Sequence, residues 1–272
     1  MAHGRERSLL LATLLENPET VTCIHLLTQD DCIVYMSGDQ RLGLTAVLQA
    51  KGLPAEPVGF GSNAEALWQQ LSQVKDWQCI EVDREVATPL AQIISSQLKT
   101  RVCLLDDIYH IPRARVSPFE DESVRQLVLD DLSLLEALPR EAQPVGFWGD
   151  LRTSLTRGMV AGAIVEGRVV ATCFVAARGQ RYVDIAVYAQ ENHRRHGFAT
   201  AAASIVTRSV QSDGLVPVWS CGSHNIPSLK VARKLGFIEV SRRTYVVIEK
   251  YLADVSSRTY PVRNERESKA AD

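Results

Sequence analysis

The sequence predicts an α/β protein built around a mixed β-sheet, and three observations lead to that prediction. First, 46% of the 272 residues are hydrophobic and 23% are charged, a composition typical of a folded globular chain. Second, helix-like and strand-like segments alternate through the first half. Third, the second half has three consecutive strand-like segments followed by alternating helix and strand. At about 100–200 residues per domain, this length allows one large domain or two small ones.

Charge and cysteine content exclude several classes of protein. The 30 lysines and arginines nearly balance 32 acidic residues, so the chain lacks the basic face of a nucleic-acid-binding protein. No apolar run approaches the roughly 20 residues of a membrane span, so we expect neither a nucleic-acid nor a membrane partner. The six cysteines form no CxxC pair, which favours reduced thiols in a cytoplasmic protein.

Residues 1–111 are predicted to form a small N-terminal α/β domain. Runs with apolar residues at helical spacing alternate with short runs of β-branched and apolar residues. The predicted helices are Ser8–Leu15, Ala64–Val74 and Pro89–Leu98, and the predicted strands are Val21–Leu27, Cys32–Met36, Gln78–Val82 and Arg101–Leu105. The first two strands flank a polar turn and would form a hairpin. Residues 112–123 hold two prolines and many charges with little to bury, which is typical of a linker.

Residues 124–252 are predicted to form the second domain. Aspartates at 130 and 131 can cap a helix, and Glu166–Gly167 can form the turn of a hairpin. The predicted strands are Val124–Leu129, Met159–Val165, Arg168–Ala177, Tyr182–Ala189, Val216–Ser220 and Thr244–Tyr251. The helix that the aspartates cap is predicted to end at about Leu138, and the other predicted helices are Phe147–Leu155, Gly197–Val210 and Pro227–Leu235. The polar stretch 253–272 is predicted to be a disordered tail.

The segment between Val183 and Val206 has the features of an anion-binding site. A β-branched strand leads through Arg194, Arg195, His196 and Gly197 into an alanine-rich helix. A helix N-terminus presents unpaired N–H groups and a partial positive charge, and a glycine lets the backbone approach a phosphate closely. Taken alone, the segment fits an ordinary strand–loop–helix connection with solvated charges equally well.

A second segment makes the first more specific. After a short strand, Asn225 can cap a helix that stops at Gly236–Phe237. Together the two segments resemble the GNAT superfamily of acyl-CoA-dependent N-acetyltransferases. The run Arg194–Ala199 fits that family's Q/R-x-x-G-x-G/A loop, and the later family signature matches Asn225, Ser228, Ala232, Gly236 and Phe237. The resemblance covers about Val124–Tyr251 and is closest to a subgroup with a degenerate N-terminal α/β domain.

The resemblance implies a GNAT-like fold for residues 124–252, with splayed central strands, and acetyl-CoA as co-substrate. Acetyl-CoA would lie between Tyr182–Ala189 and Val216–Ser220, with its pantetheine arm along the first of these strands. An N–H near Val187 would polarise the thioester carbonyl. The residues implied in binding acetyl-CoA are Val187, Ala189, Arg194, Arg195, His196, Gly197, Phe198, Ala199, Thr200 and Asn225. For Asn225, a plain helix-capping role is an equally good interpretation.

The catalytic groups depart from the family pattern. Many members carry a tyrosine acid four residues after the Ser228 position, and here that residue is Ala232. Many also carry a glutamate base where this chain has Val183; Asp184 is adjacent but faces the other side of a regular strand, and only a β-bulge would turn it into the cleft. We predict Asp184 and Tyr188 as catalytic residues. His193 and His224 are further candidates, and each of these four side chains also has an ordinary structural interpretation.

These features predict transfer of an acetyl group to an amine, with a small-molecule acceptor, by direct attack. A protein lysine or N-terminal acetyltransferase and a non-catalytic acyl-CoA-binding module are the alternatives. An acceptor groove covered by residues 1–111 would favour a small molecule. No metal is expected, because Asp106, Asp107 and His110 have no second set of ligands nearby in the sequence. A second copy of the chain, in a homodimer, is a candidate partner.

Overall fold

The computed structural model describes residues 2–38 and 43–257, and its first half alternates helices and strands. In order, the elements are α1 (Ala2–Thr13), α2 (Val21–Gln29), β1 (Cys32–Ser37), β2 (Thr45–Ala50), β3 (Leu53–Phe60), α3 (Ala64–Leu71), β4 (Cys79–Asp83), α4 (Arg84–Leu98) and β5 (Val102–Pro112).

The second half begins with a strand and two short helices. These are β6 (Val124–Leu127), α5 (Leu132–Glu136) and α6 (Leu151–Arg157), followed by the consecutive strands β7 (Val160–Val165), β8 (Arg168–Arg178) and β9 (Tyr182–Ala189). Then come α7 (Phe198–Ser212), β10 (Val216–Gly222), α8 (Ile226–Lys234), β11 (Phe237–Ile248) and α9 (Leu252–Ser257). None of the helices described is long and apolar enough to cross a membrane.

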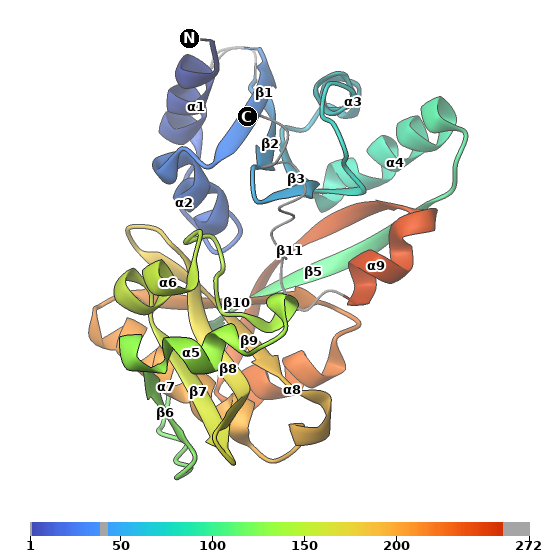
Figure 1. Ribbon diagram of the computed structural model, residues 1–272. Coiled ribbons are helices and arrows are strands. Elements are labelled where there is room, and N and C mark those ends of the chain that lie inside the picture. The colour runs from blue at the N-terminus through green and yellow to red at the C-terminus, as the bar shows by residue number, and fades with distance from the viewer. Residues whose placement is uncertain (1, 39–42, 258–272) are drawn as a thin grey trace, which may run out of the picture.

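Within the described residues, eleven strands form one sheet that runs through both halves, and Figure 1 shows β5 and β11 crossing between them. The strand order is β1-β2-β3-β4-β11-β5-β10-β9-β8-β7-β6. Strand β5 of the first half is therefore inserted between β10 and β11 of the second. It pairs antiparallel with β11 from Phe237–Pro112 to Ile248–Val102, and with β10 from Trp219–His110 to Gly222–Asp107. The predicted α/β fold with a mixed sheet is confirmed.

Helices cover both faces of this sheet. On one face, here called the α2 face, α1 and α2 pack on β1–β3, while α5 and α6 pack on β6–β9. On the opposite face, the α7 face, α3 and α4 pack on β2 and β4, while α7 and α8 pack on β7–β11. Because side chains alternate between the faces of a strand, neighbouring residues of the central strands reach different helices.

The predicted strand Val21–Leu27 is wrong, because these residues form helix α2. A short apolar run cannot be assigned to helix or strand by periodicity alone. Six of the nine residues of α2 are buried, because the helix lies against β1–β3 and also against β8 and β9. Burial on several sides removes the polar stripe that marks a surface helix. The predicted hairpin with Cys32–Met36 is therefore absent, and β1 pairs with β2 instead.

Other strands of the central sheet are longer than predicted or were not predicted. Strands β2 and β3 carry no clear alternation, and β3 contains two prolines. Strand β5 continues past Leu105 to Pro112, and β11 begins at Phe237 rather than Thr244. The polar residues Asp106, Asp107 and His110 lie inside β5, where strand partners on both sides satisfy the backbone.

The segments predicted as linker and tail are partly packed. In the predicted linker, Val116 is buried against α7, and its N–H donates to Gln211 Oε1 at 2.9 Å. The first residues of the predicted disordered tail, 253–257, lie in α9, and residues 258–272 lie outside the described residues. The halves share one sheet through β5, while the proposed domain boundaries at 111 and 123 stay a prediction.

A buried arginine ties the inserted strand to its neighbours. Arg243 of β11 is 2% exposed and donates to Asp83 Oδ1 at 2.5 Å and to the Gly59 carbonyl at 2.7 Å. Its Nε lies 3.6 Å from Glu81 Oε1, which also accepts the Tyr109 hydroxyl at 2.5 Å. The side chain thus connects β3, β4, β5 and β11 in a place where a lone charge would be costly.

We expect Arg243→Met to lower the free energy of unfolding by about 3–5 kcal/mol, because it leaves the Glu81 carboxylate buried without its cation. Arg242→Met is the matched control, since Arg242 pairs with Glu239 and Asp106 at the surface. An exposed pair contributes only about 0.2–1 kcal/mol. Urea denaturation measures both losses. Equal losses would show that the buried ion pairs do not hold β11 in place.

Candidate active site

The parallel strands β9 and β10 separate partway along their length. They pair from Tyr182–Val216 to Asp184–Val218, and the pairing ends there. Strand β9 continues to Ala189 beside β8, while Trp219–Gly222 of β10 pair with β5. The two strands therefore splay apart, as the sequence predicted. We call the opening between residues 185–189 and 219–222 the β9–β10 gap.

The edge of β9 that faces this gap carries free hydrogen-bonding groups. The Gln190 N–H donates to the Val170 carbonyl at 2.9 Å, on the β8 side. Because N–H groups alternate along a strand, those of Val187 and Ala189 point away from β8, into the gap. Val187, Tyr188 and Ala189 are half-buried, whereas residues 183–186 are buried. An extended ligand could pair with this edge as another strand would.

The loop after β9 ends in the N-terminus of α7. Arg195 has φ 68° and Gly197, the residue before the helix, has φ 94°; no side chain caps this end. The first N–H groups of the helix, at Phe198, Ala199 and Thr200, have no acceptor within the helix. Such an end attracts anions.

The charged residues of this loop are exposed, and its small residues are not. Arg194, Arg195 and His196 are exposed, Gly197, Phe198 and Ala199 are half-buried, and Thr200 is buried. A Cβ at position 197 would lie 3.4 Å from the ring of Phe119, over which Lys234 Nζ sits at 4.1 Å. Glycine therefore suits the left-handed backbone, while a Cβ here would make only ordinary contact with Phe119. The loop brings all the predicted phosphate-binding residues together.

Asn225 lies on the other side of the β9–β10 gap and caps α8. Its Oδ1 accepts the Ser228 N–H at 3.2 Å, and Ser228 Oγ accepts the Trp219 indole N–H at 2.9 Å. Ala232 is fully buried against α7 and β11. The helix therefore has no phenol that could protonate a leaving thiolate at this position.

Asp184 is buried at the point where β9 and β10 separate, on the α2 face. Thr22 Oγ1 lies 3.5 Å from its Oδ2. The nearby β-bulge is in β8, between Val175 and Ala177, so β9 itself keeps its alternation. Asp184 therefore stays opposite in direction to Val183, which packs against α7.

The remaining candidate bases surround the gap without meeting in one cluster. Tyr188 is half-buried near α5 and α6, and burial raises the pKa of its hydroxyl. His193 is half-buried, and its Nδ1 is buried without a hydrogen-bond partner. His224 is exposed, with Nε2 at 3.2 Å from the Ser256 carbonyl.

One acidic residue at the gap was not predicted as part of the site. Asp107 lies in β5 directly opposite Gly222, the last residue of β10, and is 7% exposed. Burial, together with the charges of Glu81 and Asp184, raises the pKa of Asp107 well above its usual range. In the sequence, Asp107 and Tyr109 are two residues apart, so in a strand their side chains would share one face. This pattern points to a polar face only if the strand predicted at Arg101–Leu105 is extended past Leu105.

Cys221 lies on β10 within the stretch that borders the gap. It is half-buried on the α7 face, and burial raises its pKa to about 11. Since the thiolate is the nucleophilic form, Cys221 is a poor nucleophile at neutral pH.

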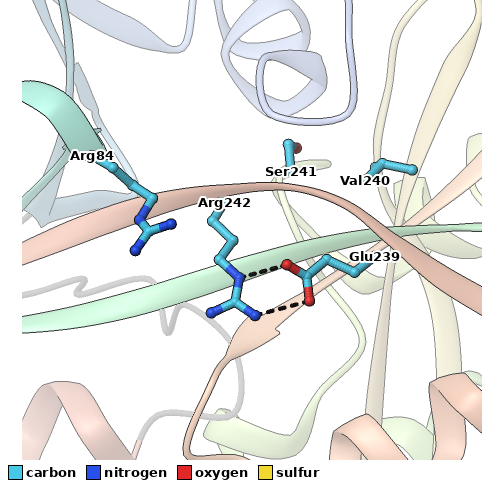
Figure 2. Close-up of a pocket in the computed structure, with 5 residues that line it drawn as sticks. All are labelled: Arg84, Glu239, Val240, Ser241 and Arg242. Carbon is cyan, nitrogen blue, oxygen red and sulfur yellow. Dashed lines mark hydrogen bonds and ion pairs between the residues drawn. The ribbon is translucent and has the colours of Figure 1, made fainter.

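A shallow polar depression lies elsewhere, at the β-bulge of β11 between Glu239 and Ser241. It has a volume of about 350 Å³ and is lined by Arg84, Glu239, Val240, Ser241 and Arg242. Figure 2 shows Arg242 and Glu239 joined by two hydrogen bonds, with Ser241 pointing the other way. Asp106 is 3.5 Å from Arg242 and 3.7 Å from Arg84. The charged side chains of this depression pair with one another, and no residue of β9 or α7 lines it.

Comparisons with known proteins show which family and fold this chain resembles. The sequence model of the family described as GNAT acetyltransferase matches residues 64–247. The "uncharacterized N-acetyltransferase YdfB" of Bacillus subtilis (strain 168) is 26% identical over 98 residues, which is 36% of this chain and 38% of that protein.

Two solved structures share the fold across both halves. A GCN5-related N-acetyltransferase-like protein from Streptococcus suis 89/1591 has 17% identity and a TM-score of 0.65, over 90% of this chain and 98% of that one. A tandem GNAT protein from the clavulanic acid biosynthesis pathway has 14% identity and a TM-score of 0.53, over 89% and 92%.

Proposed function

The chain belongs to the GNAT acetyltransferase family, and from this membership we propose that it transfers an acetyl group from acetyl-CoA to the amine of a small molecule. The observation that carries the proposal is the β9–β10 gap, which has a free strand edge along one side and leads to the uncapped N-terminus of α7. A strand edge suits the amide groups of a pantetheine arm, and a helix N-terminus suits a pyrophosphate.

Each predicted contact has a group suited to it. The Val187 and Ala189 N–H groups face the gap, so they can bind the pantetheine arm and polarise the thioester carbonyl. The backbone of residues 195–200 receives the pyrophosphate, and the exposed side chains of Arg194 and Arg195 attract its charge. Asn225 positions α8 on the far side of the gap.

We propose direct attack of the amine on the thioester. A thiol has a pKa of about 8.5, so the CoA thiolate leaves with little help from an acid. The absence of a phenol at position 232 is then tolerable. An alkyl ammonium with a pKa near 10.4 is neutral only about once in several thousand molecules at pH 7, so the essential help is to the amine.

Coverage of the α2 face supports a small acceptor. Residues before and within α2 contact the second half directly: Glu16 Oε1 accepts the N–H groups of Arg181 and Tyr182 at 2.8 and 2.9 Å. The His25 ring lies within 3.4 Å of the Arg178 and Phe147 carbonyl oxygens. These contacts cover β8 and β9 on the side from which an acceptor would reach Asp184. A long peptide would need a more open groove.

Gly197→Glu should abolish acetyl-CoA binding, because a carboxylate beside the α7 N-terminus would exclude the pyrophosphate by bulk and like charge. Gly214→Glu is the matched control: Gly214 follows the same helix, has φ 76° and has open space around its Cβ position. Both variants carry the same backbone strain and added charge. Isothermal titration calorimetry with acetyl-CoA compares them, and undiminished affinity in folded Gly197→Glu protein would contradict the assignment of the phosphate loop.

Cys221→Ala should keep its turnover within about threefold of wild type, because the protonated thiol takes no part in direct attack. Wild-type protein incubated with acetyl-CoA alone should show no added acetyl group on Cys221 by peptide mass spectrometry. A stable acetyl-enzyme, or loss of activity in a folded Cys221→Ala protein, would favour a covalent intermediate instead.

A further inference from the structure

We propose that Asp107, contributed by the first half of the chain, is the catalytic base that takes a proton from the acceptor ammonium, and that Asp107 and Asp184 together bind this cation. The inference rests on the proposed acetyl transfer and adds to it the residue that deprotonates the acceptor. It also defines the acceptor as a primary amine that arrives protonated.

Strand register places Asp107 next to Gly222, on the side of β10 away from β9, one strand from the β9–β10 gap. In the β9–β10 pairing, Val218 is opposite Asp184. Gly222 lies four residues further along β10, and in the β5–β10 pairing it is opposite Asp107. Four residues beyond Asp184 on β9 is Tyr188, next to the Val187 N–H that faces the gap. Asp107 therefore lies beside the wide part of the gap, at the level where the thioester would be held.

Asp107 and Asp184 lie on the same face of the sheet. Residues directly opposite each other in paired strands point to the same side. Asp184 is opposite Val218, and Val218 packs with Tyr109 and Val21 of α2; Asp107 is two residues from Tyr109. Both carboxyl groups thus point to the α2 face. Gly222 has no side chain of its own, and the His224 ring occupies the place of its Cβ on this face, so His224 lies between Asp107 and the gap.

Acidic groups outnumber basic groups around Asp107. The titratable groups that face it are Glu56 of β3, Glu81 of β4, Tyr109 of β5, Asp184 of β9, Arg243 and Tyr245 of β11, and His224 after β10. Arg243, the cation in this set, lies directly opposite Asp107 in the β5–β11 pairing, and it also pairs with Glu81, Asp83 and Glu19. A protonated amine would supply the missing positive charge.

The proton transfer balances without any further reagent. The Asp107 carboxylate takes one proton from R–NH3⁺ and gives R–NH2. The amine nitrogen then forms a bond to the thioester carbonyl carbon, the C–S bond breaks, and the thiolate takes the second proton from the nitrogen. The products are the amide and CoA–SH, and Asp107 releases its proton to solvent. Because its pKa is raised by burial and like charge, Asp107 is better matched to this task than an ordinary carboxylate.

Asp106 provides a matched control on the neighbouring position. Its side chain points to the α7 face, where Thr244 Oγ1 donates to it at 3.1 Å and Arg242 lies 3.5 Å away. Asp106→Asn and Asp107→Asn thus remove the same charge from adjacent residues of one strand, and only the second removes it from the gap.

The experiment measures CoA release with ethanolamine, putrescine and spermidine between pH 6 and pH 9.5. With each accepted amine, Asp107→Asn should lower kcat/KM by 10²–10⁴-fold at pH 7, whereas Asp106→Asn should stay within threefold of wild type. The rate of Asp107→Asn should rise about tenfold per pH unit, because the amine must lose its proton to water. Equal kcat/KM values and pH profiles for the two variants would overturn the proposal.

Stability and amine binding separate this role from a structural one. Because the native pKa of Asp107 is raised, wild-type protein loses stability as the pH rises from the usual aspartate pKa to the native one. Asp107→Asn removes that loss, so its stability at pH 8 should equal or exceed wild type. A marked decrease would assign Asp107 a structural role.

Calorimetry of CoA-loaded protein with spermidine gives a readout that needs no turnover. Asp107→Asn should bind spermidine at least tenfold more weakly than Asp106→Asn. Wild-type protein that binds acetyl-CoA but neither binds nor acetylates any of the three amines would overturn this inference and leave the cofactor assignment standing. Failure to bind acetyl-CoA at all would instead contradict the proposed function.

Discussion

The insertion of β5 between β10 and β11 is the constraint on which the rest of the structure depends. Strand β10 pairs with β9 only as far as Val218, and from Trp219 onward its neighbour is β5. This change of partner is what lets β9 and β10 diverge while the backbone of β10 stays hydrogen-bonded. The same insertion brings Asp107 of the first half to the gap and gives β11 its long pairing with β5.

The insertion also explains why the polar groups of the sheet centre are tolerated. Apolar clusters occupy both halves on each face, while Glu81, Tyr109 and Arg243 meet where the halves join. Arg243 lies among the carboxylates of Glu19, Glu81 and Asp83, and Asp107 and Asp184 are also buried on this face of the sheet. In a sheet used only for stability, apolar side chains would serve better there. A buried acid whose pKa is strongly raised, as that of Asp107 is, is typical of a functional site.

Local features of the chain were predictable from its sequence, whereas features that depend on distant contacts were not. The loop at Gly197 and the cap at Asn225 have signatures contained in a few neighbouring residues, and the structure has a helix starting after each. The sequence of helix α2 predicts a strand, because burial against both halves makes the helix apolar on most sides. The sequence alone does not point to Asp107, since its place near the gap depends on β5 pairing with a strand more than 100 residues later.

Amide hydrogen exchange of Val187 and Ala189, measured by NMR with and without acetyl-CoA, tests the central claim that the β9–β10 gap holds the cofactor. Both N–H groups face the gap, whereas the Tyr188 N–H faces β8 and serves as an internal reference. Acetyl-CoA should slow exchange at Val187 and Ala189 and at the first turn of α7, with little change at Tyr188. Saturating acetyl-CoA that leaves the exchange of Val187 and Ala189 unchanged would contradict the account.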